Sequence, residues 1–154
     1  MIKSAGALFY CSSTKRYLFL LRDNHPRYAN TWCFPGGKMK KGESEFDGAL
    51  RELREELGIN VAAKGSFSTL LGRSIPYIKT IPIEKFTSED GKFEYHTYVF
   101  VVENEFMPIL NHEHKGYCWT KLRGWPKPLH PALHTTLKKN KIKEKLKIIE
   151  DQFI

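Results

Sequence analysis

Five glutamates lie in the segment from residue 36 to 59, which reads GGKMKKGESEFDGALRELREELGI, and three of them are crowded near its end. Glu55 and Glu56 follow Glu52 by three and four residues. On one helix these residues share a face, so their carboxylates repel one another. A divalent cation would relieve the repulsion, because hard cations such as Mg²⁺ take oxygen ligands. A solvated acidic face is the alternative that the spacing alone allows.

The residues before this helix suit a phosphate-bearing substrate. The run FPGGK at 34–38 contains two glycines, which let the backbone approach a neighbour closely, and a carbonyl from this loop is a candidate metal ligand. Lys38, Lys40 and Lys41 attract a phosphate group to the same place.

The segment resembles the Nudix box. That pattern is Gly, five residues, Glu, seven residues, then Arg-Glu-apolar-x-Glu-Glu-x-Gly-apolar. Every fixed position is matched, by Gly37, Glu43, Arg51, Glu52, Leu53, Glu55, Glu56, Gly58 and Ile59. Nine constrained positions at fixed spacing make the match specific. The flanking runs TWCFPGGK and GYCWTKL are also similar to that family, so the resemblance spans most of the chain.

The resemblance implies an α/β fold, a Nudix-type α/β/α sandwich with a mixed β-sheet, and the use of Mg²⁺ or Mn²⁺. It implies these metal ligands: Glu52, Glu55, Glu56 and the carbonyl of Gly36. Glu52 is also a candidate base for the attacking water, and Arg51 is grouped with the catalytic residues. The pairing of Glu43 with Arg51 is expected to be structural, as are Gly37 and Gly58.

A further acidic residue often lies late in the chain of such proteins. Glu113, in the run NHEHKGYCW at 111–119, is our candidate for a base or ligand, and a surface loop is its alternative. His112 and His114 flank it, but an oxygen-rich site does not need zinc.

The substrate implied is a nucleoside diphosphate linked to another moiety. ADP-ribose hydrolases of this family tend to carry a proline 15 to 18 residues past the box, and dinucleoside polyphosphate hydrolases a tyrosine. Pro76 and Tyr77 stand side by side there. We expect Lys38 and Tyr77 to bind the substrate, Tyr77 by stacking on a base, although packing is its alternative. ADP-ribose or a dinucleoside polyphosphate is favoured over a nucleoside triphosphate.

The surrounding pattern predicts the elements that position these residues. A hairpin is expected from 3–11 and 16–23, a loop over 24–38, and a helix over 44–57 that Ser44 caps and Gly58 stops. Strands are expected within 60–86 and over 92–103 and 115–122, and a loop over 123–131 before a helical end. His130 precedes Pro131, which favours a loop-to-helix junction. We predict one Nudix hydrolase domain over 1–154.

Composition narrows the class of protein. The 154 residues carry a formal net charge of +8, which attracts anions. Three wide-spaced cysteines, and the lack of an apolar run or leader pattern, favour a cytoplasmic protein without a membrane partner. Six lysines at 137–147 predict a solvated helix face, with nucleic-acid binding as the sharper alternative. A homodimer is compatible with the sequence.

Overall fold

The computed structural model describes residues 1–23, 27–63, 66–69 and 72–153. Within these ranges, nine strands form one mixed sheet in the order β3-β2-β1-β8-β7-β6-β5, with β4 paired to β1 and β9 paired to β2. The strands are β1 (Ile2–Cys11), β2 (Arg16–Arg22), β3 (Trp32–Cys33), β4 (Gly36–Lys38), β5 (Ile59–Ala63), β6 (Ser66–Thr69), β7 (Ser74–Thr87), β8 (Phe93–Val102) and β9 (His114–Thr120).

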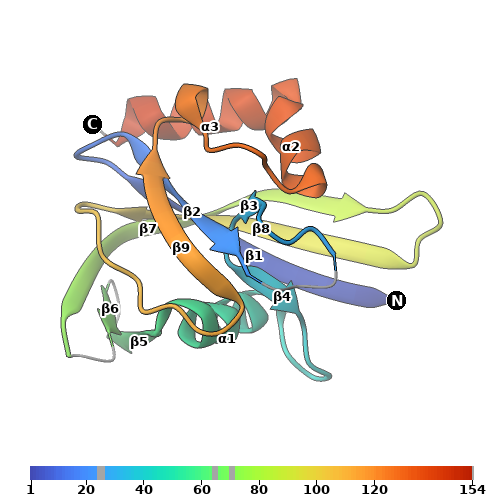
Figure 1. The fold of residues 1–154 in the computed structure, drawn as a ribbon, viewed down its shortest axis with the longest axis horizontal. Coiled ribbons are helices and arrows are strands. Elements are labelled where there is room, and N and C mark those ends of the chain that lie inside the picture. Colours follow the sequence, from blue (N-terminus) through green and yellow to red (C-terminus); the bar gives the residue numbers. More distant parts are fainter. Residues whose placement is uncertain (24–26, 64–65, 70–71, 154) are drawn as a thin grey trace.

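Helices cover both faces of this sheet. Helix α1 (Glu45–Leu57) lies on one face, and α2 (Pro131–Lys138) and α3 (Asn140–Gln152) lie on the other (Figure 1). A short 3₁₀ turn, η1 (Leu122–Gly124), precedes α2. The three layers confirm the predicted α/β class.

The two central strands build a separate core on each face. Strands β1 and β8 pair in parallel from Ile2 opposite Phe93 to Cys11 opposite Val102. Because side chains alternate along a strand, Phe9 packs with Leu53 on the α1 side, while Leu8 packs with Leu137 on the α2 side. The sheet is therefore buried on both faces. Packing of these two cores fixes the positions of α1 and α2 relative to the sheet.

Helix α1 begins and ends where the sequence predicts. The Ser44 hydroxyl accepts a hydrogen bond from the Asp47 N–H at 3.1 Å. Gly58 adopts φ 67°, in the left-handed region, and its N–H donates to the Arg54 carbonyl. The predicted hairpin is also confirmed, since β1 and β2 pair antiparallel.

The prediction of a loop over 24–38 is partly wrong. Residues 24–26 lie outside the described ranges, but the segment also contains β3 and β4. Strand β4 pairs Gly36 with Gly6 of β1. A β-carbon at Gly36 would lie 2.7 Å from the Ala5 carbonyl oxygen, so only glycine fits there. Glycine is depleted in strands, and the sequence therefore indicates a loop.

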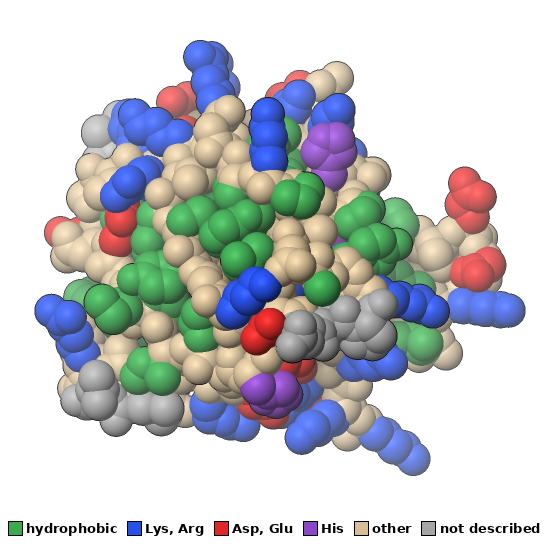
Figure 2. Space-filling model, in the orientation of Figure 1, with side chains coloured by type: hydrophobic (Ala, Val, Ile, Leu, Met, Phe, Trp, Pro, Cys, Tyr) green, Lys and Arg blue, Asp and Glu red, His purple; other side chains and the backbone are tan. Residues whose placement is uncertain are grey.

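Basic side chains are spread over the surface rather than gathered on the last helix. In Figure 2, lysines and arginines project around the rim of the molecule, and hydrophobic side chains occupy much of the middle. Two of the lysines from the basic run are held against β7. Lys139 contacts Glu84 at 2.8 Å, and Lys145 donates to the Ile83 carbonyl at 2.7 Å.

Candidate active site

Two carboxylates of α1 lie against the glycine pair of β4. The Gly36 N–H donates to Glu56 Oε2 at 2.6 Å. A β-carbon on Gly37 would lie 2.6 Å from Glu52 Oε1. Glu52 and Glu56 are 8% and 4% exposed, which is unusual for glutamate. The FPGGK run therefore lets β4 reach the carboxylates of the helix.

Arg51 links the remaining acidic residues. Its Nε and Nη2 donate to the two carboxylate oxygens of Glu43 at 2.7 and 3.1 Å. Its Nη1 donates to Glu52 at 3.0 Å and to Glu55 at 3.2 Å, and its Nη2 also donates to the Lys38 carbonyl at 2.8 Å. The hydrogen bonds from Arg51 to Glu43, together with one from the Lys40 N–H, lower the pKa of Glu43 to about 2. Arg51 thus holds β4, the loop after it and α1 together.

Burial destabilises the ionised forms of the Glu52 and Glu56 carboxylates. Burial raises the pKa of Glu56 well above its usual range, and the charge of Glu52 adds to the effect. Burial also raises the pKa of Glu52, against the hydrogen bond from Arg51. A hard divalent cation would favour the ionised forms, and the oxygen donors present are the kind it binds. The donor set therefore fits Mg²⁺ or Mn²⁺.

The predicted ligands are not the tightest acidic cluster in the described part of the chain. Among those residues, the only group whose ligand atoms all lie within 4.8 Å of one another is Glu45, Glu94 and His96. Lys3 and Lys85 contact Glu94 at 3.6 and 3.3 Å, so lysine already balances that group. Glu52 and Glu55 instead share Arg51, while Glu56 contacts Gly36.

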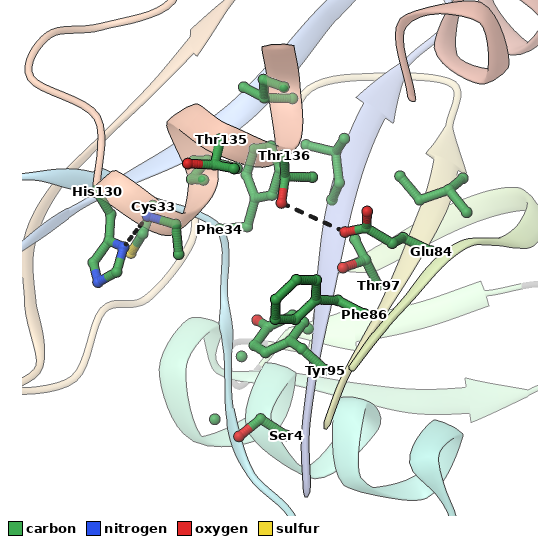
Figure 3. A pocket seen from close by; sticks show the side chains of 18 of the residues that line it. Ser4, Cys33, Phe34, Glu84, Phe86, Tyr95, Thr97, His130, Thr135 and Thr136 are labelled. Atoms are coloured by element: carbon green, nitrogen blue, oxygen red, sulfur yellow. Dashed lines mark hydrogen bonds between the residues drawn. The ribbon is translucent and has the colours of Figure 1, made fainter. Parts of the chain in front are cut away.

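A cavity of about 690 Å³ opens beside the carboxylates, between the sheet and α2 (Figure 3). Glu56 and Glu113 line it, together with the basic residues Arg22 and Lys38. Glu113 is exposed, and its N–H donates to the Asn111 side chain at 2.9 Å. Its charge contributes to the raised pKa values of Glu52 and Glu56. The structure thus brings the late acidic residue to the same site as the helix.

Comparison with known proteins agrees with this arrangement. A family model described as the NUDIX domain matches residues 2–139. The chain belongs to the Nudix family. The fold is similar to that in a crystal structure of a C. elegans Ap4A hydrolase, with a TM-score of 0.65. The two chains are 21% identical, and the match covers 95% of this chain and 97% of that one. A MutT protein from Methanosarcina mazei is 25% identical, with a TM-score of 0.64 and 94% of each chain covered.

Sequence relatives match over shorter stretches. A Bacillus subtilis protein named "Uncharacterized Nudix hydrolase YvcI" is 35% identical over 79 residues, which cover 42% of this chain and 50% of the relative. The chain spans half or less of the length of the curated relatives it matches. No helix within the described ranges is long and apolar enough to span a membrane.

A buried histidine lies beside the Nudix glutamates. His114 Nδ1 lies 3.9 Å from Glu56 Oε1 and has no hydrogen-bond partner among the described residues. Its Nε2 lies 3.5 Å from Cys33 Sγ. Burial lowers the pKa of His114 to about 4 and raises that of Cys33 to about 12, so both are neutral near pH 7. No local pattern in the sequence indicates this contact, because 81 residues separate Cys33 from His114.

Tyr77 lies elsewhere than the predicted substrate site. Its ring stacks on Phe67 at a centroid distance of 4.7 Å, as part of the core on the α1 side. It is not among the residues that line the cavity, and its position matches the packing alternative. The aromatic residues that do line the cavity are Phe34, Phe86, Phe93 and Tyr95. Lys38, the other predicted substrate-binding residue, lines the cavity.

Proposed function

We propose that this Nudix protein hydrolyses the pyrophosphate link of a nucleoside diphosphate joined to a second moiety, and that the reaction depends on Mg²⁺ or Mn²⁺. The observation that carries the proposal is the cavity lined by both Glu56 and Glu113. Its volume of about 690 Å³ lies in the range of small-molecule sites.

The α1 carboxylates supply the cation site. Glu52, Glu55 and Glu56 would hold the cation, with the Gly36 carbonyl as a further ligand. When bound, the cation would neutralise pyrophosphate oxygens and make an attacking water more acidic. The hydrogen bond from Gly36 to Glu56 keeps that carboxylate in place, and Arg51 does the same for Glu52.

Glu113 is the better placed of the two candidate bases. Glu52 Oε1 already accepts a hydrogen bond from Arg51, and this bond opposes protonation. Glu113 is exposed and lines the cavity, where its carboxylate can accept a proton from water. Arg22 and Lys38 line the same cavity and would bind the substrate phosphates.

ADP-ribose and dinucleoside polyphosphates are the favoured substrates within this class. The adjacent Pro76 and Tyr77 support the choice, because they match the markers of these two kinds of Nudix hydrolase. Nucleoside triphosphate pyrophosphohydrolase activity is the alternative. The site takes a small molecule, and nucleic acid is a less favoured partner.

A substrate panel tests the proposal directly. The full chain is assayed with Mg²⁺ or Mn²⁺ against ADP-ribose, dinucleoside polyphosphates, nucleotide sugars, FAD, NADH and nucleoside triphosphates. We expect a nucleoside monophosphate and a second phosphorylated product, and no turnover after chelation. The highest kcat/KM for a nucleoside triphosphate, with pyrophosphate released, would support the alternative. No turnover of any member would reject both.

A further inference from the structure

A bulge in β7 turns an acidic side chain into the cavity. Consecutive residues of a regular strand face opposite sides, but Ile83 and Glu84 both line the cavity. The pairing of β7 with β8 shifts register between Pro82 and Glu84, which accounts for the exception. Phe86, two residues further, lines the cavity as well. The bulge therefore places a carboxylate next to an aromatic ring on one wall.

Glu84 is held in position but keeps free acceptor capacity. Its side chain is 13% exposed. Thr136 Oγ1 donates to Oε1 at 3.4 Å, and Lys139 Nζ contacts Oε2 at 2.8 Å (Figure 3). A carboxylate has about four lone-pair sites, so two remain for a ligand. The contacts with Thr136 and Lys139 therefore orient Glu84 without using all of its acceptors.

The surroundings of Glu84 suit a flat ring. Figure 3 shows Glu84 directed toward Thr136 of α2, while Phe86 and Thr97 point from the strands into the space below the helix. Apolar side chains from the α2-side core complete the walls: Leu8, Ile83, Leu133, Leu137 and Ile142. On this wall of the cavity, which is aromatic and aliphatic, the Glu84 carboxylate favours a ring that carries N–H donors at its edge.

We propose that Glu84 reads the base of the substrate by accepting a hydrogen bond from an exocyclic amino group of a purine. The inference rests on the proposed nucleotide function. It places the base of the nucleotide beside Glu84, in the same cavity that Glu56 and Glu113 line. Adenine offers a 6-amino group and guanine a 2-amino group, so the shared chemistry is the amino-bearing purine edge. Hypoxanthine has neither amino group: it keeps only the N1–H donor, which guanine also has, beside a 6-oxo oxygen that a carboxylate repels.

Binding of nucleoside monophosphates tests this without turnover. AMP, GMP and IMP are titrated into the full-length protein and the dissociation constants are compared. A hydrogen bond to a charged group is worth enough that IMP should bind at least about tenfold more weakly than the better of AMP and GMP. Preference for AMP assigns the adenine edge, and preference for GMP assigns the guanine edge.

The variant Glu84→Gln separates base reading from a structural role. Glutamine keeps the shape and one acceptor but also carries an amide donor. The preference over IMP should fall to within about threefold, while Glu144→Gln, an exposed change on α3, should leave it intact. A thermal unfolding curve like that of the wild type confirms that the variant folds.

Two results would overturn the inference. One is equal binding of IMP, AMP and GMP by the wild-type protein. The other is an equal loss for all three ligands in Glu84→Gln, which would make Glu84 a support for Thr136 and Lys139. Failure of the proposed function is seen separately, as a substrate panel without pyrophosphate hydrolysis, whereas failure here leaves hydrolysis in place and removes only the base preference.

Discussion

Glu56 combines burial, a short backbone hydrogen bond and a neighbouring negative charge. Buried glutamates are rare unless paired, because an unpaired ion loses its hydration. Gly36 satisfies one oxygen of Glu56, and Glu52 nearby raises the electrostatic cost. A side chain that is destabilised when charged and yet aimed into a cavity is typical of a functional residue.

Glu56→Gln should remove most of the activity while the fold persists. The amide oxygen still accepts from Gly36, so the change removes charge and little shape. We expect hydrolysis at saturating Mg²⁺ to fall by about two orders of magnitude or more, as for loss of one preorganised electrostatic contact. The metal-free variant should unfold at a higher temperature than the wild type. Near wild-type turnover would reject the metal-ligand assignment, and Glu144→Gln serves as control.

Glu113→Gln should lower kcat with little change in KM. A general base typically contributes about 10²–10⁴-fold, and a group that acts on the attacking water contributes little to ground-state binding. Steady-state kinetics on the best substrate measure both constants. A loss smaller than about threefold would leave Glu52 as the base.

His114 should make the protein sensitive to mild acid. Burial depresses its pKa from 6.5 to about 4. Between these values the unfolded chain binds more protons than the folded one, so the free energy of unfolding falls as the pH drops from 6.5 toward 4. The loss attributable to His114 is on the order of 3 kcal/mol.

Denaturant unfolding at pH 7 and pH 4.5 measures this loss. His114→Gln should lose less stability between the two values than the wild type, whereas His112→Gln, a change at an exposed position, should behave like the wild type. Equal pH dependence in His114→Gln and the wild type would show that other groups dominate.

At the scale of elements, the sequence predicts what local chemistry determines. Ser44 and Gly58 set the ends of α1, and the strands predicted over 3–11, 16–23 and 92–103 correspond to β1, β2 and β8. Strand β4 is not predicted from the sequence. Its glycines are needed because Gly36 pairs with Gly6 of β1, which is distant in sequence.

The cavity depends on pairings that no local pattern encodes. Glu84 faces inward because β7 shifts register against β8, and the register of a strand pair is a tertiary property. His114 and Arg22 reach the site through the pairing of β9 with β2. Tyr77 has the right place in the chain for a marker, yet its half-buried ring stacks on Phe67 and packs against the core on the α1 side. The sequence therefore predicts the carboxylates of α1 but not the side chains that line the cavity around Glu84.

Gly37→Ala tests the contact between β4 and α1. The added methyl would lie 2.6 Å from Glu52 Oε1, and pairing with β1 restrains β4 from moving away. We expect Glu52 to be displaced, with a loss of Mg²⁺ affinity of about tenfold or more, as when a residue supporting a metal ligand is changed. Gly124→Ala is the matched control, since nothing lies within 4 Å of the added carbon. Unchanged Mg²⁺ affinity would contradict the close approach.

At the scale of the whole molecule, a cluster of buried carboxylates lies in a protein of positive net charge. The formal charge is +8, and on the face drawn in Figure 2 the lysines and arginines are spread around the rim. Such a charge attracts anions from a distance, while the buried carboxylates would repel a phosphate at close range. A divalent cation bound to these carboxylates would remove the conflict, because it would reverse the local sign of charge where we propose that the substrate phosphates bind.

Mg²⁺ should therefore stabilise the folded protein, and more so at higher pH. The raised pKa of Glu56 means that the folded, metal-free protein keeps a proton that the unfolded chain has lost above its ordinary glutamate pKa. Without metal, the contribution of Glu56 to stability falls as the pH rises above about 4.5, up to its folded pKa, which is opposite in sign to the contribution of His114. The cation competes with that proton, so its affinity increases over the same range. At a Mg²⁺ concentration of about 100 times the dissociation constant, the gain in unfolding free energy is about 2.7 kcal/mol.

Thermal unfolding with Mg²⁺ or with a chelator, at pH 5.5 and pH 8, measures the coupling. The increase in Tm caused by Mg²⁺ should be larger at pH 8 in the wild type. It should be small at both values in Glu56→Gln, because the ligand charge is gone and no proton is displaced. An equal increase at the two pH values in the wild type would contradict the link between metal and buried carboxylate. An undiminished increase in Glu56→Gln would place the Mg²⁺ site elsewhere, with the cluster of Glu45, Glu94 and His96 as the next site to test.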